Sequence, residues 1–126
     1  PDRIFSEEEL REIRERGFIE SINQLLTKPS TDEKRILGNL TRIECQPNNI
    51  FYHVKAGERV LKFRSDSFET VGLFALNGEL GRKKLACGSL EKDNLAVILY
   101  RPGKDSVLSG EVRAIDFVPP NSKLLN

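Results

Sequence analysis

The pattern of hydrophobic and polar positions changes near residue 35. Before that point, apolar residues recur every three or four positions, which is the spacing of one helix face. Ser6 and Glu9 have the spacing of a capping box, which begins a helix. We predict a helix over residues 7–27, bent or divided into a helix pair at Gly17, because glycine is unfavourable inside a helix. Its apolar positions are Leu10, Ile13, Phe18, Ile22, Leu25 and Leu26.

The remainder of the chain consists of short apolar or alternating runs separated by turn residues, which is typical of strands. The tightest turn is predicted at Asn77-Gly78, because both residues tolerate positive φ. Residues 102–109 are predicted to connect two neighbouring strands, with Tyr100 and Val112 on adjacent strands. The predicted strands are 36–46, 50–55, 59–64, 71–76, 83–87, 95–100 and 110–118.

This pattern indicates an α+β fold that is mainly β. We expect an N-terminal helix or helix pair, followed by a small antiparallel β-barrel or sandwich of about five to seven strands. The predicted division is a helical segment (1–35), a compact β domain (36–119) and a C-terminal tail (120–126). The predicted core is Leu40, Ile43, Val60, Phe63, Leu73, Leu85, Val97, Leu99, Val112, Ile115 and Phe117.

The composition is that of a soluble globular protein. The chain has 126 residues, enough for a single domain, and 38% of them are hydrophobic. Its 20 basic and 19 acidic residues give a net charge of +1, which produces no general attraction to nucleic acids or membranes. No apolar run approaches the roughly 20 residues of a membrane span. The chain lacks Met, so we expect it to be a trimmed or mature fragment of a longer protein. The sequence assigns no compartment, and the bacterial cytoplasm and export both stay open.

Basic and aromatic side chains interleave between positions 51 and 64. Small barrels bind single-stranded nucleic acid through cationic grooves in which bases stack on aromatic rings. The alternative is a pair of ordinary solvated strands, since lysines on edge strands also discourage aggregation. The candidate binding residues are Phe51, Tyr52, Lys55, Arg59, Lys62 and Arg64.

Cys45 and Cys87 each end an apolar run and allow several interpretations. They can be two buried thiols, which is the usual state of free cysteine, or a disulfide across the β domain. Together with His53, the single histidine, they supply three of the ligands that a zinc site needs, but without paired Cys-x-x-Cys spacing. The sequence has no Gly-x-Ser-x-Gly and no phosphate-binding loop. We therefore expect no enzyme activity, no metal and no cofactor.

Five short blocks resemble a small all-β domain found at the C-terminal end of uncharacterised bacterial proteins. They lie within residues 36–119 and read GNLTRIEC, VLKF, LACG, VILYRPGKD and GEVRAIDF. The resemblance implies a compact barrel or sandwich and assigns no activity.

The sequence favours a non-catalytic binding or accessory module that contacts a protein partner or the rest of its parent chain. The predicted helix is the expected contact element. The alternative is a small barrel that binds single-stranded nucleic acid with residues 51–64. A small molecule or lipid inside the barrel is a third possibility, for which no residue argues.

Overall fold

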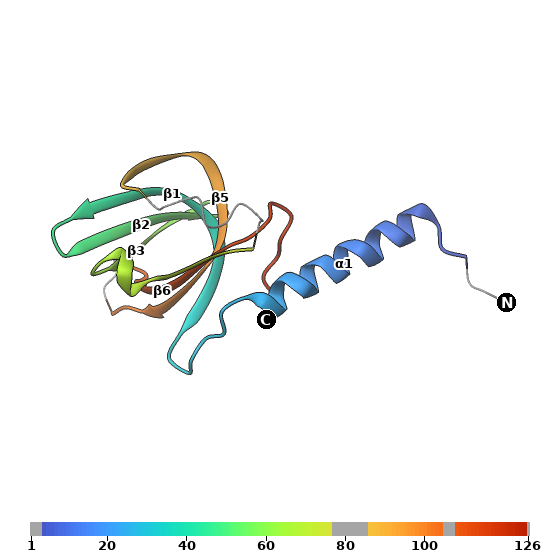
Figure 1. Ribbon diagram of the computed structural model, residues 1–126, viewed down its shortest axis with the longest axis horizontal. Helices are drawn as coiled ribbons and strands as arrows, with labels where there is room; N and C mark the ends of the chain where they lie inside the picture. The colour runs from blue at the N-terminus through green and yellow to red at the C-terminus, as the bar shows by residue number, and fades with distance from the viewer. Residues whose placement is uncertain (1–3, 77–85, 105–107, 126) are drawn as a thin grey trace.

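The computed structural model describes residues 4–76, 86–104 and 108–125, without the side chains of residues 91–93. A single helix, α1 (Glu7–Leu25), extends away from a β-barrel, and the N-terminus lies at its far end (Figure 1). The Ser6 hydroxyl accepts a hydrogen bond from the Glu9 backbone at 3.1 Å, and the Glu9 carboxylate accepts from the Ser6 backbone. The predicted capping box is therefore present.

The prediction of a bend or a helix pair is wrong, because α1 runs without interruption through Gly17. A Cβ atom at this position would meet no other atom within 4 Å. The penalty of one glycine, about 1 kcal/mol, is too small to break a helix that is capped and anchored elsewhere. The helix also ends two residues earlier than predicted, at Leu25.

Six strands follow among the described residues. Two predicted features lie wholly or partly outside the described residues: the turn at Asn77-Gly78, and residues 83–85 of the predicted strand 83–87. The last two strands are separate, as predicted, but the first of them begins at Gly88 and runs through the predicted break at residues 88–94. The strands are β1 (Lys34–Gln46), β2 (Asn49–Ala56), β3 (Arg59–Ser65), β4 (Gly72–Ala75), β5 (Gly88–Pro102) and β6 (Gly110–Phe117), with a 3₁₀ turn η1 (Phe68–Thr70) before β4.

The sheet closes on itself. Its order is β3-β2-β1-β5-β6-β4, and an additional pairing of β3 with β6 completes a barrel of β1, β2, β3, β6 and β5. Most neighbours are antiparallel, as predicted, but β6 pairs in parallel with both β3 and β4. Gly110 lies where β6 joins β3, and a Cβ there would collide with the carbonyl oxygen of Arg101 on β5. A residue without a side chain is therefore needed at this contact.

The barrel core contains most of the predicted residues. Leu40, Ile43, Phe63, Val112 and Ile115 are buried inside the barrel. Val97 and Leu99 are buried as well, but Val97 belongs to a second cluster outside the barrel. Leu73 and Phe117 are only partly buried, and Leu85 lies outside the described residues. Val60 was wrongly predicted, because 69% of its surface is exposed. Val60 and Phe63 are three residues apart on β3, and side chains alternate between the two faces of a strand, so both cannot point inward.

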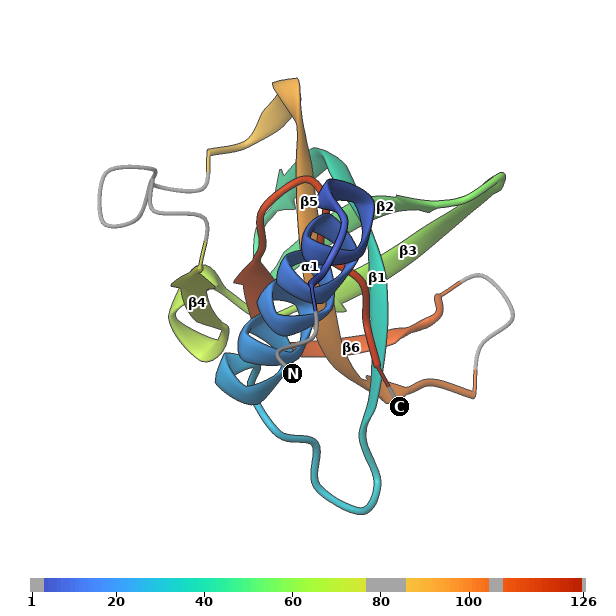
Figure 2. The same cartoon turned by 90° about the vertical axis from the view of Figure 1, so that its right-hand side faces the viewer.

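A second apolar cluster attaches the end of α1 to the barrel. Ile22 and Leu26 pack with Val97 of β5 and with Val118, just beyond β6. The C-terminal tail then crosses beside the last turns of the helix (Figure 1 and Figure 2). The Asn23 side chain donates to the Lys123 carbonyl at 2.7 Å and accepts from the Leu125 backbone at 2.9 Å. One side-chain amide thus holds the tail against the helix.

Candidate interaction surfaces

The outer face of β2 and β3 carries four of the six predicted binding residues, Phe51, Lys55, Lys62 and Arg64, and we call it the β2–β3 face. Phe51, Lys55 and Lys62 alternate with buried neighbours and point away from the core. Cross-strand pairing brings Phe51 opposite Arg64, and Lys55 opposite Val60. Arg59 begins β3 and is exposed, but by alternation it lies on the side of Leu61 and Phe63 and is not part of this face.

Tyr52 is not part of this face. It alternates with Phe51 and is completely buried, with its hydroxyl 2.8 Å from the Ser65 hydroxyl. Burial raises the pKa of the Tyr52 phenol, and the hydrogen bond between Tyr52 and Ser65 lowers it by a smaller amount. The assignment of Tyr52 as a binding residue was therefore wrong, and the buried ring cannot stack on a base.

Much of the positive charge on the β2–β3 face is already paired. Arg64 donates to Asn49 at 3.0 Å and to Asp66 at 2.6 Å, and its third partner is Glu111 at 3.6 Å. The Lys62 ammonium lies 4.4 Å from the centroid of the Phe51 ring, so it covers the one aromatic side chain on this face. Lys55 is the exposed cation of this face for which the described residues provide no such contact.

His53 also has a local partner. Its Nε2 lies 2.7 Å from the Glu44 carboxylate on β1. The hydrogen bond with His53 lowers the pKa of Glu44 below its usual value. The three residues considered as zinc ligands, His53, Cys45 and Cys87, are not available as a set, because the two cysteines are bonded to each other and supply no thiolate. No group of three or more metal-ligating acids, histidines or cysteines occurs among the described residues.

The Cys45–Cys87 disulfide joins the end of β1 to the residue before β5, across 42 positions of sequence. Both cysteines are exposed, so the interpretation as buried free thiols is wrong. β1 and β5 already pair here, with Ile43 opposite Gly88. The bond therefore secures one end of an existing strand pair and is accessible to solvent.

The exposed surface of α1 is more apolar than that of the barrel strands. Ile13 is 50% exposed and Leu25 is 65% exposed, while Leu10 and Phe18 are exposed to a smaller extent. Ile4 and Phe5, just before the helix, extend this surface, and Ile4 is 91% exposed. Ile22 is the only buried residue of α1, so the predicted amphipathic stripe packs on the barrel only at its end. Most of the helix makes no contact with the barrel (Figure 1).

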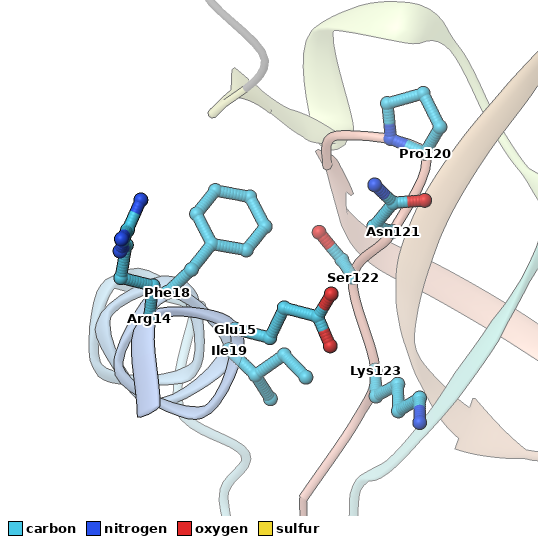
Figure 3. Close-up of a pocket in the computed structure, with 8 residues that line it drawn as sticks. All are labelled: Arg14, Glu15, Phe18, Ile19, Pro120, Asn121, Ser122 and Lys123. Atoms are coloured by element: carbon cyan, nitrogen blue, oxygen red, sulfur yellow. The ribbon is translucent and has the colours of Figure 1, made fainter. Parts of the chain in front are cut away.

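A hollow of about 720 Å³ separates α1 from the C-terminal tail. Figure 3 shows Phe18, Glu15 and Ile19 on the helix side, with Glu15 and Ile19 directed toward the tail. Ser122 on the opposite side is buried, and its hydroxyl has no hydrogen-bond partner among the described residues. The remaining lining residues are Arg14, Pro120, Asn121 and Lys123.

Two buried acids fix the segment between α1 and β1, and sequence reasoning did not find their roles. Asp116 of β6 accepts hydrogen bonds from the Thr27 backbone at 2.8 Å and from the Thr27 hydroxyl at 2.9 Å. Glu33 accepts a hydrogen bond from Arg113, which lowers the pKa of Glu33 to about 2 with help from the Ser30 backbone. The same contact raises the pKa of Arg113. These contacts fix the base from which α1 projects.

The predicted connector at residues 102–109 joins β5 to β6, and its residues 105–107 lie outside the described part of the chain. Its ends meet through a hydrogen bond from the Gly103 backbone to the Ser109 carbonyl at 3.3 Å. Tyr100 pairs with Val112, as predicted. In the described part of the chain, no helix combines the length and apolar character that a membrane crossing requires.

Comparison with known proteins identified no relative. No family model, no curated protein and no solved structure matches the chain. The resemblance to a C-terminal bacterial all-β domain therefore stays a prediction, as does the division of the chain into three segments.

Proposed function

We propose that this chain is a non-catalytic binding module that docks onto another protein, or onto another part of its own polypeptide, through α1. The observation that carries this proposal is the row of large apolar side chains on α1 that neither the barrel nor the tail covers. A helix gains most of its stability in proteins from packing of an apolar face, and short isolated helices are marginal in water. A partner that covers Leu10, Ile13 and Phe18 would supply this missing packing.

Burial gives this docking its driving force. Each Å² of apolar surface removed from water contributes about 25 cal/mol, so a few large side chains can supply several kcal/mol before the costs of association. The barrel, in contrast, buries most of its own apolar residues, with Val60 and Phe74 as separate exposed exceptions, and its β2–β3 face is occupied by ion pairs and by Lys62 over Phe51. The α1 surface is therefore the better supported contact element.

Site-specific photo-crosslinking in cells that express the chain naturally tests this proposal. A benzoylphenylalanine introduced at Ile13 should yield covalent adducts, which mass spectrometry identifies. The same amino acid at Lys55, an exposed position of the barrel, is the matched control. Adducts at position 13 that are lost when Leu10→Glu is added support α1 docking. Equal yields at both positions, or adducts at position 55 alone, contradict it.

A second candidate function is the binding of single-stranded nucleic acid on the β2–β3 face. The five strands follow one another as in OB-fold barrels, which use the face of their second and third strands to bind oligonucleotides and oligosaccharides. Lys55 on this face and Arg59 at the adjoining end of β3 are the exposed cations that favour it. Fluorescence anisotropy with a labelled single strand should then show binding that weakens as salt rises. Absence of binding at low salt, or binding unchanged by Lys55→Glu/Arg59→Glu, removes this candidate.

A further inference from the structure

We infer that the partner of α1 is α1 of a second copy of this chain, packed antiparallel about a two-fold axis near Phe18. This inference rests on the proposed docking role of α1 and names its partner. Four observations carry it: the exposed apolar row, the open backbone at Gly17, the charges beside the row, and the distribution of charge between the two ends of the helix.

The apolar row has the spacing of a helix–helix contact. Leu10 and Ile13 are followed at one and two further turns by Gly17 and Ser21, and then by Leu25. Gly17 lies in the middle of this row, with open space where a side chain would be. No contact within the described chain accounts for a glycine here. A second helix crossing at this point accounts for it, because its side chains can pack directly on the exposed backbone.

One edge of the row carries a positive and a negative charge that can pair with the same two charges on a second copy of the helix. Arg16 and Glu20 follow Ile13 by three and seven positions, so they lie on the same side of the row. Neither forms an ion pair within the described part of the chain. An antiparallel pairing centred near Phe18 brings Arg16 of each copy beside Glu20 of the other.

The same axis also matches the apolar residues. Leu10 and Leu25 lie at nearly equal distances along the helix on either side of Phe18. The pairing that joins Arg16 to Glu20 therefore joins Leu10 of one copy to Leu25 of the other. Phe18 of each copy then packs beside Gly17 of its partner.

The two ends of the helix favour the antiparallel direction. The first turn of α1 is acidic, with Glu7, Glu8 and Glu9, and its last turn has no basic residue of its own. An antiparallel pair places Glu7 near Lys28, which follows the helix of the second copy, and aligns the two helix dipoles favourably. A parallel pair would instead place like charges together along the whole contact, which is unfavourable.

Sedimentation velocity of the purified chain tests this inference. A contact confined to one helix per copy is at the small end of specific interfaces, so we expect dissociation at about micromolar concentrations or above. The sedimentation coefficient should rise from the monomer toward the dimer value as protein concentration increases to about 1 mM. A monomer over the whole range overturns the inference.

Charge exchange tests the register. Arg16→Glu and Glu20→Arg should each weaken the dimer about tenfold or more, because each places like charges together twice. The double variant Arg16→Glu/Glu20→Arg should restore it. The matched control is Glu15→Arg, which makes the same charge change on the side of the helix that is directed toward the C-terminal tail and should leave association unchanged. If the single variants disrupt the dimer and the double variant does not restore it, the proposed pairing is wrong.

Gly17→Ala distinguishes an effect on the dimer contact from an effect on the stability of the helix. Alanine favours the helix over glycine, and its Cβ meets no atom of the same chain, so the melting temperature should stay equal or rise. The second helix would lose its close approach, so the dimer should weaken. A dimer unchanged by Gly17→Ala overturns the crossing point.

The two proposals fail separately. Adducts in cells from position 13, together with a purified chain that stays monomeric, leave α1 docking intact and overturn the second copy as its partner. Absence of adducts at position 13 contradicts α1 docking itself.

Discussion

Phe63 provides the most direct test of the barrel core. Its side chain is 0% exposed, and its ring lies 4.8 Å from the ring of Tyr100, centroid to centroid. Phe63→Ala removes this contact and leaves a cavity, which the strands of the closed barrel cannot move inward to fill. The expected loss in the free energy of unfolding is about 3–5 kcal/mol. For a chain of this size, it corresponds to a fall in melting temperature of about 10–20 °C.

Val60→Ala is the control on the same strand, because Val60 is mostly exposed and points to the other face. Its expected cost is within about 0.5 kcal/mol, as for most surface substitutions. Urea denaturation followed by far-ultraviolet circular dichroism measures both variants. A loss below about 1 kcal/mol for Phe63→Ala, or an equal loss for Val60→Ala, would refute the assignment of the inner face of β3.

Three further predictions concern the contacts that connect the elements. Glu33→Gln should lower the free energy of unfolding at neutral pH. A carboxylate whose pKa is lowered on folding loses its stabilising contribution as the pH falls from 4.5 toward 2, so the stability difference between the variant and the native chain should shrink over that window. Thermal melts at several pH values measure this difference. Reduction of the Cys45–Cys87 disulfide should cost about 4 kcal/mol in the chain-entropy model, measured by urea denaturation with and without reductant, and a cost near zero would contradict that model here. Asp116→Asn should cost about 1–3 kcal/mol, because one carboxylate oxygen that accepts from Thr27 becomes a donor; an unchanged melting temperature would exclude a structural role for this buried pair.

Local sequence patterns predicted the local structure well. The capping box at Ser6 and Glu9 depends on three-residue spacing alone, and it is present. The bounds of β3 and β6 differ from the prediction by one residue, since turn residues enclose both strands. The pairing of Tyr100 with Val112 follows from a connector that begins with Pro and Gly.

Errors arose where alternation was not applied strictly. Tyr52 was grouped with the exposed residues around it, although Ile50 and Val54, two positions away on either side, are both buried. Val60 was placed in the core for its apolar character alone. In each case, the two-residue period of a strand assigns the side chain to the correct face once one neighbour is known.

Other features depend on contacts between distant segments, so no local pattern contains them. The parallel contacts of β6 with β3 and β4 depend on how the sheet curls. Asp116 holds Thr27 from 89 positions away, and nothing near Asp116 in the sequence indicates a partner. The exposed face of α1 was predicted as an apolar stripe, but only the structure determines which part of the stripe the barrel covers.

The closure of the barrel has a consequence for its local opening. β1 pairs with β5 over most of its length, whereas β3 and β6 share two register pairs, Phe63 with Gly110 and Arg64 with Glu111. The disulfide secures the β1–β5 side and does not cross this junction. A ring of strands separates first where the fewest backbone hydrogen bonds must break. Amide protons at the β3–β6 junction should therefore exchange with solvent faster than those between β1 and β5. The barrel then opens locally between β3 and β6 while the disulfide-linked β1–β5 pair stays closed.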